Sequence, residues 1–475
     1  LFVYGDLTLG PNGTFTDDGG HLRVEGNWIN NGTYTAGSAN RRVYLIGGAQ
    51  TISGSTSTTF EKLYINSGSY VTLAQNITIS NFIELNGTLD PTANFFVTAG
   101  NNEIDINSGG ELIVKAATFT GNYSAGSAQN TSNNSIINYA STTVNQTIDN
   151  TEPYENLKIS GSMVKSAGGN LSIDRDLIIE GGTLDLQTFT ANRNSSGGSL
   201  TLGDGTILRI GGTNTFPNNY SSNLISPSST VEYYGVNQTV RSLSYGNLSL
   251  LSSGGSITKT MPGTSFSVAG NFTTSASAGT LAATAGNSLA IAGNVNLGAG
   301  TTFTGSTFTH TVGGDWTNNG TYQGCNGTIT STGVGTVFSG AGINNFGNLT
   351  VSGNGTTVHS NTSLSLCGNF STTGGGSFTH ATGGTGTFTM TGTAKTITGS
   401  NISLDDFIIG SGSVSTTSTM VIAGDLTSTG TFTATAGSVS LTGAGKVISG
   451  AGALQFFALN VPGSITTSRN LSIAS

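Results

Sequence analysis

The stretch from Gly313 to Tyr322 reads GGDWTNNGTY, and it nearly repeats the stretch from Glu25 to Tyr34, EGNWINNGTY. Both copies contain a corner slot, in which Gly and then Asn or Asp precede a large apolar residue. The clearest copies are Gly26-Asn27-Trp28, Gly270-Asn271-Phe272, Gly314-Asp315-Trp316 and Gly368-Asn369-Phe370, with others at Gly5, Gly293 and Gly424. Adjacent copies lie 21 residues apart (Gly5 to Gly26), 23 apart (Gly270 to Gly293) and 21 apart (Gly293 to Gly314). This period indicates that one backbone corner recurs on successive coils of a solenoid.

A second marker reads Gln-Thr-Ile at residues 50–52 and 146–148, with variants at 238–240, 336–338, 395–397 and 446–448. The first three intervals are 96, 92 and 98 residues, whereas the last two are 59 and 51 residues. Intervals of about 100 residues are typical of immunoglobulin-type sandwiches, but a sandwich does not lose about 40 residues and keep its pattern. A solenoid can lose two coils, because each coil contacts only its neighbours. The intervals therefore favour a solenoid over a string of sandwiches.

The composition favours many short strands and tight turns. The 475 residues include 72 Gly, 7 Pro, 22 Phe and 13 Tyr, and only 8% are charged. Thr, Phe and Tyr favour strands, whereas Gly and Asn favour turns. Apolar residues alternate along the chain, and no stretch shows the apolar period of a helix. The sequence therefore predicts an all-β parallel β-helix.

We expect one continuous β-solenoid over residues 1–475, with about 20 coils of roughly 21–23 residues. Residues 1–245 form the more charged half, and residues 246–475 are nearly uncharged. Aliphatic and aromatic side chains should form inward rows, with Thr, Ser and Asn outside. Corner glycines should adopt positive φ, and the neighbouring Asn or Asp should bond to the backbone. Most parallel β-helices are right-handed, and the same hand is expected here by analogy.

Both ends of the sequence fall inside repeat slots, since Leu1–Leu7 matches Phe266–Phe272 and Arg469–Ser475 stops at the Gly position of the slot. We therefore expect a window from a longer repeat array, or copies that stack end to end. The net charge of −8 comes without a basic patch, which argues against a nucleic-acid partner. No apolar run reaches the roughly 18 residues of a membrane span, so none is expected.

Candidate catalytic carboxylates coincide with repeat positions. The candidates are Asp174-Arg175-Asp176 with Glu180, Asp405 with Asp406, and Glu103 with Asp105. Asp176 falls in the corner slot, and Glu103 and Asp105 share one side of a strand, an arrangement open to a cation. Polysaccharide hydrolases and lyases need paired carboxylates or a carboxylate with a metal in a groove. No such cluster lies outside the repeat, so we expect no enzyme, no catalytic residue and no cofactor.

The histidines and cysteines are sparse. His21, His310, His359 and His380 are isolated in the sequence, so no metal site is expected. Cys325 and Cys367 lie 42 residues apart, close to two coils. Two coil steps separate Cα atoms by about 9.6 Å, whereas a disulfide needs them within about 7 Å. A disulfide therefore requires a shift of the coil between them, and two buried free thiols are the favoured interpretation.

The phrases GNWINNGTY, GAQTISG (Gly48–Gly54) and LTVSGNGTTV (Leu349–Val358) resemble the long repeat regions of secreted surface proteins of Bacteroidota. These include the giant adhesins of gliding species, which the type IX system exports, although the C-terminal sorting domain of that family is not present in this sequence. The filamentous haemagglutinin class of β-helix adhesins is the rival resemblance. The resemblance implies an extracellular filament at the cell surface that attaches to a surface polysaccharide, another substratum or copies of itself.

Three functions remain open. The favoured one is a structural rod or stalk of an extracellular adhesin or filament, mediating attachment and surface gliding. The second is a carbohydrate-binding or carbohydrate-active β-helix, for which Tyr44 and the pair Tyr233-Tyr234 are candidate outward aromatics. The third is an ice- or mineral-binding solenoid, which the alternating Thr residues resemble but which needs one flat, regular face.

Overall fold

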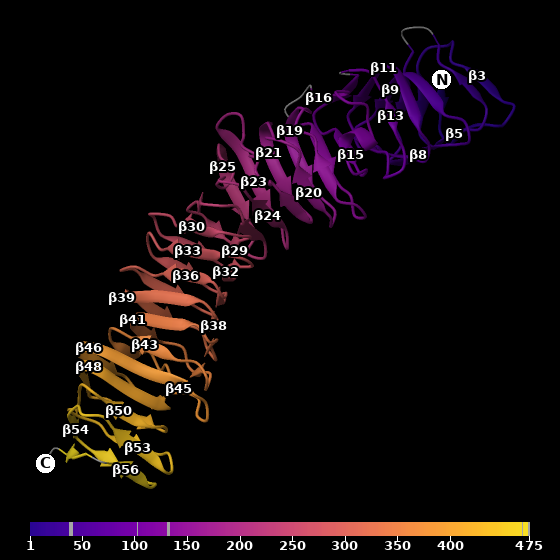
Figure 1. The fold of residues 1–475 in the computed structure, drawn as a ribbon. Coiled ribbons are helices and arrows are strands. Elements are labelled where there is room, and N and C mark those ends of the chain that lie inside the picture. Colours follow the sequence, from indigo (N-terminus) through magenta and orange to yellow (C-terminus); the bar gives the residue numbers. More distant parts are fainter. Residues whose placement is uncertain (38–40, 102, 131–133, 468, 474–475) are drawn as a thin grey trace. The chain divides into compact units, whose positions relative to one another are not determined.

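The fold is all-β and parallel, which confirms the predicted fold class. The computed structural model describes residues 1–37, 41–101, 103–130, 134–467 and 469–473. Parallel strands stack as a β-solenoid (Figure 1). It has about 22 turns, and in the described ranges the 3₁₀ turn Phe119–Gly121 is the only helical segment. The chain divides into two compact units, unit 1 (Leu1–Ser229) and unit 2 (Thr230–Ser475). One continuous solenoid over both units and its right-handed winding stay predictions.

Unit 1 contains two large sheets in which each strand pairs with a strand of the following coil. The first has 8 strands, in the order β1 (Phe2–Val3), β4 (Leu22–Val24), β7 (Val43–Leu45), β9 (Thr58–Ile65), β11 (Ile77–Leu85), β14 (Ile104–Ile106) and β16 (Ala128–Asn130), with β13 (Val97–Thr98) beside β11. The second has 11 strands, in the order β2 (Leu7–Leu9), β5 (Trp28–Asn30), β8 (Ala49–Ser53), β10 (Tyr70–Leu73), β12 (Thr88–Asp90), β15 (Glu111–Val114), β17 (Ile136–Tyr139), β19 (Tyr154–Ile159), β21 (Ile173–Ile179), β23 (Gly197–Leu202) and β25 (Tyr220–Ile225). Strands β18 (Gln146–Ile148), β20 (Val164–Ala167), β22 (Thr183–Asp185) and β24 (Ile207–Ile210) form a further ladder.

Unit 2 repeats this stacking. One ladder runs through β26 (Thr230–Tyr233), β29 (Asn247–Ser252), β32 (Phe272–Ala276), β35 (Val295–Leu297), β38 (Trp316–Asn318), β40 (Val337–Ser339), β42 (Thr356–Val358), β45 (Phe378–His380), β47 (Ile402–Leu404), β49 (Met420–Ile422), β52 (Val439–Leu441) and β55 (Leu459–Asn460). A sheet of 20 strands runs from β27 (Gln238–Thr239) to β57 (Ser472–Ile473), and it includes the long strands β39 (Thr321–Ser331), β41 (Ile343–Val351), β46 (Thr387–Thr398) and β48 (Asp406–Thr416).

Inward side chains form continuous rows along the stack. In the first sheet of unit 1, Val24, Leu45, Ile65, Leu85 and Ile106 are in register on successive strands, and all five are fully buried. Burying one such side chain stabilises a fold by about 1.5–3 kcal/mol. The rows confirm the predicted aliphatic wall, and their repetition on each coil supplies the core.

The duplicated phrase builds the same aromatic pair twice, with a buried Trp in each copy. Trp28 meets Tyr34 edge-on with ring centroids 4.9 Å apart, and Trp316 meets Tyr322 in the same way, also at 4.9 Å. Edge-to-face pairs at this distance add about 0.5–1.5 kcal/mol beyond the burial of their area. The large apolar residue of the corner slot therefore recurs because it fills the same space beneath the coil.

The asparagine two residues after each Trp belongs to the same cluster. Asn30 and Asn318 are fully buried, and each accepts the backbone N–H of the glycine two residues later. The indole N–H and the asparagine amide of one copy share an acceptor, which is the Thr58 hydroxyl in unit 1 and the Asn344 side chain in unit 2. Buried polar groups need such partners, which explains why the phrase keeps its Asn.

The Asn or Asp of the corner slot ties each coil to the next. The backbone N–H of Asn271 donates to Oδ1 of Asn247 at 2.9 Å, and that of Asn294 donates to Oδ1 of Asn271 at 2.9 Å. The series continues from Asp315 to Asn294 at 2.7 Å and from Val337 to Asp315 at 2.8 Å. The predicted bond from these side chains to the backbone is confirmed, and it forms a ladder along the stack.

The other predicted corner residues take the same role. Oδ1 of Asn27 accepts the N–H of Thr51, and Oδ1 of Asn369 accepts that of Thr396. Trp28, Phe272, Trp316 and Phe370, the apolar residues of the four clearest slots, are all buried.

The glycines of the corner slot serve close approach, and the predicted positive φ is wrong for them. None of the four clearest corner glycines has a positive φ; they are Gly26, Gly270, Gly314 and Gly368. A Cβ on Gly26 would lie 2.3 Å from the carbonyl carbon of Gly5 in the preceding coil. Since real Cβ atoms do not approach backbone so closely, glycine is required because successive corners touch.

Replacing Asn271 by Ala is expected to destabilise unit 2 by about 0.5–1.5 kcal/mol, because the N–H of Asn294 loses its acceptor. Asn271→Asp keeps Oδ1 and should cost less. Hydrogen exchange at the Asn294 amide measures the effect, with Asn296→Ala, an outward position on β35, as the control. Unchanged exchange at Asn294 in the Ala variant would contradict the ladder.

The second marker places a buried glutamine against the preceding coils. Nε2 of Gln50 donates to the carbonyl oxygens of Val24 and Gly26, while Oε1 accepts a backbone N–H of its own turn. Gln146 makes the same set of contacts, with Val114 and Ala116 as its carbonyl partners. The marker recurs because its amide satisfies turn groups that would otherwise be buried without partners.

A buried lysine lies in register one coil after two of these glutamines. Lys165 neighbours Gln146, and Lys259 neighbours Gln238. The Lys165 ammonium donates to three backbone carbonyls, and that of Lys259 donates to two carbonyls and to Oε1 of Gln238. Burial lowers the pKa of each lysine to about 8, because the charged form loses its water.

The free energy of unfolding of unit 2 is expected to rise with pH above pH 8. Lys259 has a pKa of about 8 when folded against an ordinary value of 10.5, so the unfolded chain binds more protons between these values. Since the folded chain releases the Lys259 proton at a lower pH than the unfolded chain, the free energy of unfolding should be higher at roughly pH 9.5 than at pH 7, by about 2 kcal/mol. Burial raises the pKa of Tyr322, so tyrosine ionisation in the unfolded chain opposes this gain above about pH 10.

Denaturant unfolding between pH 7 and about pH 9.5 measures this gain. The Lys259→Met variant should lose it, whereas Lys395→Met, at a half-buried position in the same unit, should keep it. Equal pH profiles for the wild type and Lys259→Met would contradict the prediction.

Candidate functional site

The densest acidic cluster is held by backbone and amide partners. Oδ1 of Asp176 accepts the N–H of Ser199 at 2.6 Å, which places Asp176 in the corner slot as predicted. Asp174 accepts the side-chain amide of Asn194 at 2.6 Å, and the Arg175 guanidinium lies 3.6 Å from Asp176. These contacts connect neighbouring coils and turns, so the cluster acts as part of the stack.

The other acidic candidates also have structural partners. Glu180 forms an ion pair with Lys158 at 2.9 Å. Oδ1 of Asp406 accepts the N–H of Asp425 at 2.7 Å, so Asp406 also occupies a corner slot. Asp405 is 3% exposed, and burial raises its pKa. The sequence pattern missed the corner position of Asp406, because a second aspartate precedes it where the slot has glycine.

The histidines do not gather into a site. His310 and His380 are buried, and burial lowers the pKa of each, while His21 and His359 are exposed. Within the described parts of the chain, no group of three or more His, Cys, Asp or Glu could hold a metal ion.

Cys325 and Cys367 form a disulfide, which corrects the favoured interpretation of free thiols. Their Cα atoms are 5.2 Å apart although their separation is 42 residues. Strand β39 shifts register against β41, so that residues 325–327 lie opposite Gly347 alone. The extra backbone carries Cys325 toward Cys367 past a residue that has no side chain. This is the coil shift that a disulfide at this spacing requires, and the length of the repeat does not reveal it.

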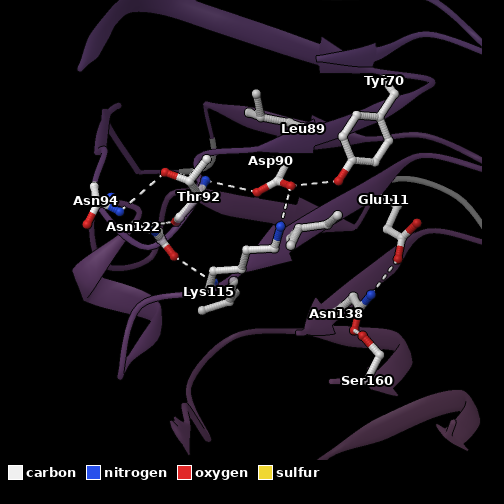
Figure 2. Close-up of polar contacts among 12 residues, drawn as sticks. Tyr70, Leu89, Asp90, Thr92, Asn94, Glu111, Lys115, Asn122, Asn138 and Ser160 are labelled. Carbon is white, nitrogen blue, oxygen red and sulfur yellow. Dashed lines mark hydrogen bonds and ion pairs between the residues drawn. The ribbon is translucent and has the colours of Figure 1, made fainter. Parts of the chain in front are cut away.

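A polar cluster that the sequence pattern did not reveal surrounds Asp90 in unit 1 (Figure 2). Oδ2 of Asp90 accepts the Tyr70 hydroxyl at 2.6 Å and the Lys115 ammonium at 2.6 Å, while Oδ1 accepts the N–H of Thr92 at 2.9 Å. The Asp90 side chain is 4% exposed. Burial, together with the hydrogen bond to Asp90, raises the pKa of Tyr70. With both carboxylate oxygens engaged, the cluster is an ion pair that closes a turn.

The cluster recurs, which identifies the signal that could have found it. The phrase Gly-Thr-Leu-Asp occurs at residues 87–90 and again at 182–185. In the second copy Asp185 accepts the N–H of Gln187 at 2.9 Å and pairs with Arg209 at 3.0 Å. Thr92 and Gln187, two residues after each Asp, both have positive φ, 57° and 51°. The acidic residue therefore supports a left-handed turn in both places.

Aromatic rings at outward positions form a column on the first sheet of unit 1, and the middle ring, Tyr64, is covered so far that it is only 6% exposed. Tyr44 on β7 and Tyr64 on β9 are in register, and their ring centroids lie 4.7 Å apart in a stacked arrangement. Phe82 on β11 continues the column, 5.7 Å from Tyr64. Tyr44 was the predicted member, and the other two were missed. On β9 the buried residues Phe60 and Leu63 are three positions apart, and β11 carries one extra residue opposite this point, so simple alternation fails on both strands.

Cations cover these rings. The guanidinium of Arg23 lies 4.9 Å from the Tyr44 centroid, and that of Arg42 lies 4.8 Å from the Tyr64 centroid. The Lys62 ammonium lies 5.0 Å from the Phe82 centroid. Each cation comes from the coil before its ring. Because the ring faces are occupied by cations and neighbouring rings, this column lacks the open aromatic face on which a sugar stacks.

Carboxylates begin on β11, the strand that also carries Phe82, and continue on the next coil. Glu84 on β11 is in register with Tyr64, and Asp105 on β14 is in register with Glu84. Burial, with Glu84 nearby, raises the pKa of Asp105. Glu103 bonds to the N–H of Gly100. We call the surface formed by Arg23, Arg42, Tyr44, Lys62, Tyr64, Phe82, Glu84 and Asp105 the ionic face.

Tyr233 is fully buried, so its predicted place on the outside is wrong. Its hydroxyl lies 3.1 Å from that of Tyr245, and Tyr139 and Tyr154 form the same pair at 3.1 Å in unit 1. The alternation of apolar and polar residues did not show which of the two consecutive tyrosines, Tyr233 or Tyr234, points inward.

Unit 2 has a hollow of about 590 Å³ over strands β28 (Ser244–Tyr245), β31 (Phe266–Val268), β34 (Leu289–Ile291) and β37 (Thr309–Val312), lined mainly by Ser and Thr. Nearby, Thr239, Thr260, Thr284 and Thr304 form an outward column, which Gln323 and Asn345 continue without threonine hydroxyl groups. The column is too short for the regular threonine face that an ice-binding solenoid needs.

Comparisons with protein-family models, curated proteins and solved structures gave no match. Among the residues that the structure describes, no helix is long and apolar enough to span a bilayer.

Proposed function

We propose that this chain is a structural segment of an extracellular adhesin or surface filament, and that its stacked coils carry tension between an anchored part and an attachment site. Three kinds of contact support this proposal, because all of them join one coil to the next. They are the parallel strand pairing, the corner ladder of Asn and Asp, and the inward rows of apolar side chains. The resemblance to secreted Bacteroidota repeat regions agrees with it.

The disulfide Cys325–Cys367 is the observation that carries the proposal. It joins residues that are 42 positions apart in a repeat whose adjacent slots lie 21 to 23 residues apart, so it bypasses the hydrogen bonds of one intervening coil. Disulfides persist outside the reducing cytosol, which favours an exported protein. A covalent link between coils also limits how far the chain extends under load, by about 150 Å for a loop of this length.

Labelling of intact source cells tests the location. Antibodies against the chain should label cells without permeabilisation, and external protease should remove the signal. Labelling that requires permeabilisation would overturn the proposal.

A second assay separates a spacer from a binding module. Purified chain added to cells should leave attachment to a surface unchanged if the segment is a spacer. Inhibition of attachment that saturates with added chain would instead favour direct binding of the substratum, which is the carbohydrate-binding alternative.

A further inference from the structure

The ionic face of unit 1 has a charge order that reverses along the stack. Its cations, Arg23, Arg42 and Lys62, come from β4, from the residue before β7 and from β9. Its carboxylates, Glu84 and Asp105, come from β11 and β14, which are the next strands of the same sheet. One half of the face is therefore cationic, the other half is acidic, and the aromatic rings lie along the cationic half and reach β11.

The two arginines leave guanidinium surface open to an external partner, although Arg42 also hydrogen-bonds the Tyr44 side chain and is attracted to Glu84 of its own chain. Arg23 is exposed and Arg42 is partly exposed, and each is held over a tyrosine ring. No ion pair in the described ranges joins either guanidinium to a carboxylate. Holding the side chain over a ring reduces the conformational entropy that a new ion pair would cost.

We infer that the ionic face docks against the ionic face of a second copy of this chain, with the two stacks antiparallel. A two-fold axis along the strand direction reverses the coil order and brings the cationic half of each copy against the acidic half of the other. Such a contact is isologous, because each copy contributes the same surface. Arg23 of one copy then opposes Asp105 of the other, and Arg42 approaches Glu84.

The charge order favours a second copy over a polyanion. An anionic polysaccharide that followed the stack past Arg23, Arg42 and Lys62 would meet Glu84 and Asp105 on the next coils, where like charges repel. A second copy in the antiparallel arrangement meets opposite charges at both ends of the face, while at the axis the two copies of β9 bring Lys62 against Lys62. Complementary potentials of this kind set the orientation of a contact as well as its rate of formation.

The size of the face sets the strength of the contact. Five strands at a spacing of about 4.8 Å cover roughly 20 Å of the stack, which gives a contact of a few hundred Å² per copy. Stable dimers bury about 800 Å² per partner, so this contact is weak and concentration-dependent. Exposed charges are screened beyond about 10 Å at 0.1 M salt, so the contact should also be salt-sensitive. It does not rest on the proposed filament function.

Sedimentation velocity of the full chain tests the inference. At about 10 mM salt the weight-average mass should rise from monomer toward dimer as concentration increases, and at about 0.5 M salt it should return to monomer. Arg23→Glu with Arg42→Glu makes the face acidic except at Lys62, and Glu84→Lys with Asp105→Lys makes it cationic throughout. Each double variant alone should stay monomeric, and an equal mixture of the two should associate more tightly than the wild type.

Controls separate a lost contact from a damaged fold. Arg175→Glu reverses an exposed charge on another sheet of unit 1 and should leave association unchanged. Arg23→Glu and Asp105→Lys as single changes provide milder variants, and circular dichroism melts confirm that each variant is folded. A wild-type chain that stays monomeric at low salt overturns the inference, as does association that persists in both double variants. Binding of polyguluronate without self-association would assign the face to an anionic partner instead.

Discussion

Replacing Trp316 by Ala is expected to cost about 3–5 kcal/mol in the stability of unit 2. Trp316 is 2% exposed and packs its ring against Tyr322 at 4.9 Å and Phe346 at 5.4 Å. Its indole N–H also donates to Asn344 at 2.9 Å, so the truncation leaves a cavity and removes a buried hydrogen bond.

The loss should be local, because each coil of a solenoid contacts only its neighbours. Hydrogen–deuterium exchange should accelerate in β38 and in the strands that pair with it, β35 and β40, before it changes at the far end of unit 2. Thr311→Ala, at an outward position on β37, is the matched control and should stay within about 0.5 kcal/mol of the wild type. Equal exchange in the two variants would contradict the shared aromatic core.

Removing the disulfide is expected to cost about 4 kcal/mol. This value follows from the entropy that a closed loop of 42 residues removes from the unfolded chain. Thermal unfolding of unit 2 with and without a reducing agent measures the effect, and the midpoint should fall on reduction.

The double variant Cys325→Ser with Cys367→Ser provides the control, because it should unfold like the reduced wild type and should not respond to the reducing agent. Quantification of thiols in the unreduced protein checks the starting state. Two reactive thiols per chain would contradict the disulfide and the prediction together.

The coil period, the fold class and the inward rows could be predicted from the sequence, because each depends on a pattern that every coil repeats. The same corner is predicted by Gly26-Asn27-Trp28 and by Gly314-Asp315-Trp316. In both, Oδ1 of the second residue accepts a backbone N–H and the Trp is buried. Because each coil needs the same side chains at the same corner, the same residue types recur in the sequence.

Features that occur only once in the structure have no repeated sequence pattern from which they could be predicted. The disulfide depends on a register shift opposite Gly347, and the rings of the ionic face lie beside an extra residue in β11. The cause of the corner glycines was also misjudged, because sequence alone does not distinguish a required φ from a required absence of Cβ. The Asp90 cluster does have a signal in the sequence, because the phrase Gly-Thr-Leu-Asp occurs at residues 87–90 and 182–185.

The corner ladder has a consequence for how the protein ages. Each rung uses the side-chain oxygen Oδ1 as its acceptor, and Asp has the same oxygen in the same place. Asp315 forms such a rung, and Asp406 and Asp425 form two successive rungs. Deamidation, the spontaneous hydrolysis that converts Asn to Asp over weeks, therefore leaves the rung intact wherever the product is ordinary aspartate. The stack would therefore persist while the asparagines of the ladder slowly convert to aspartate.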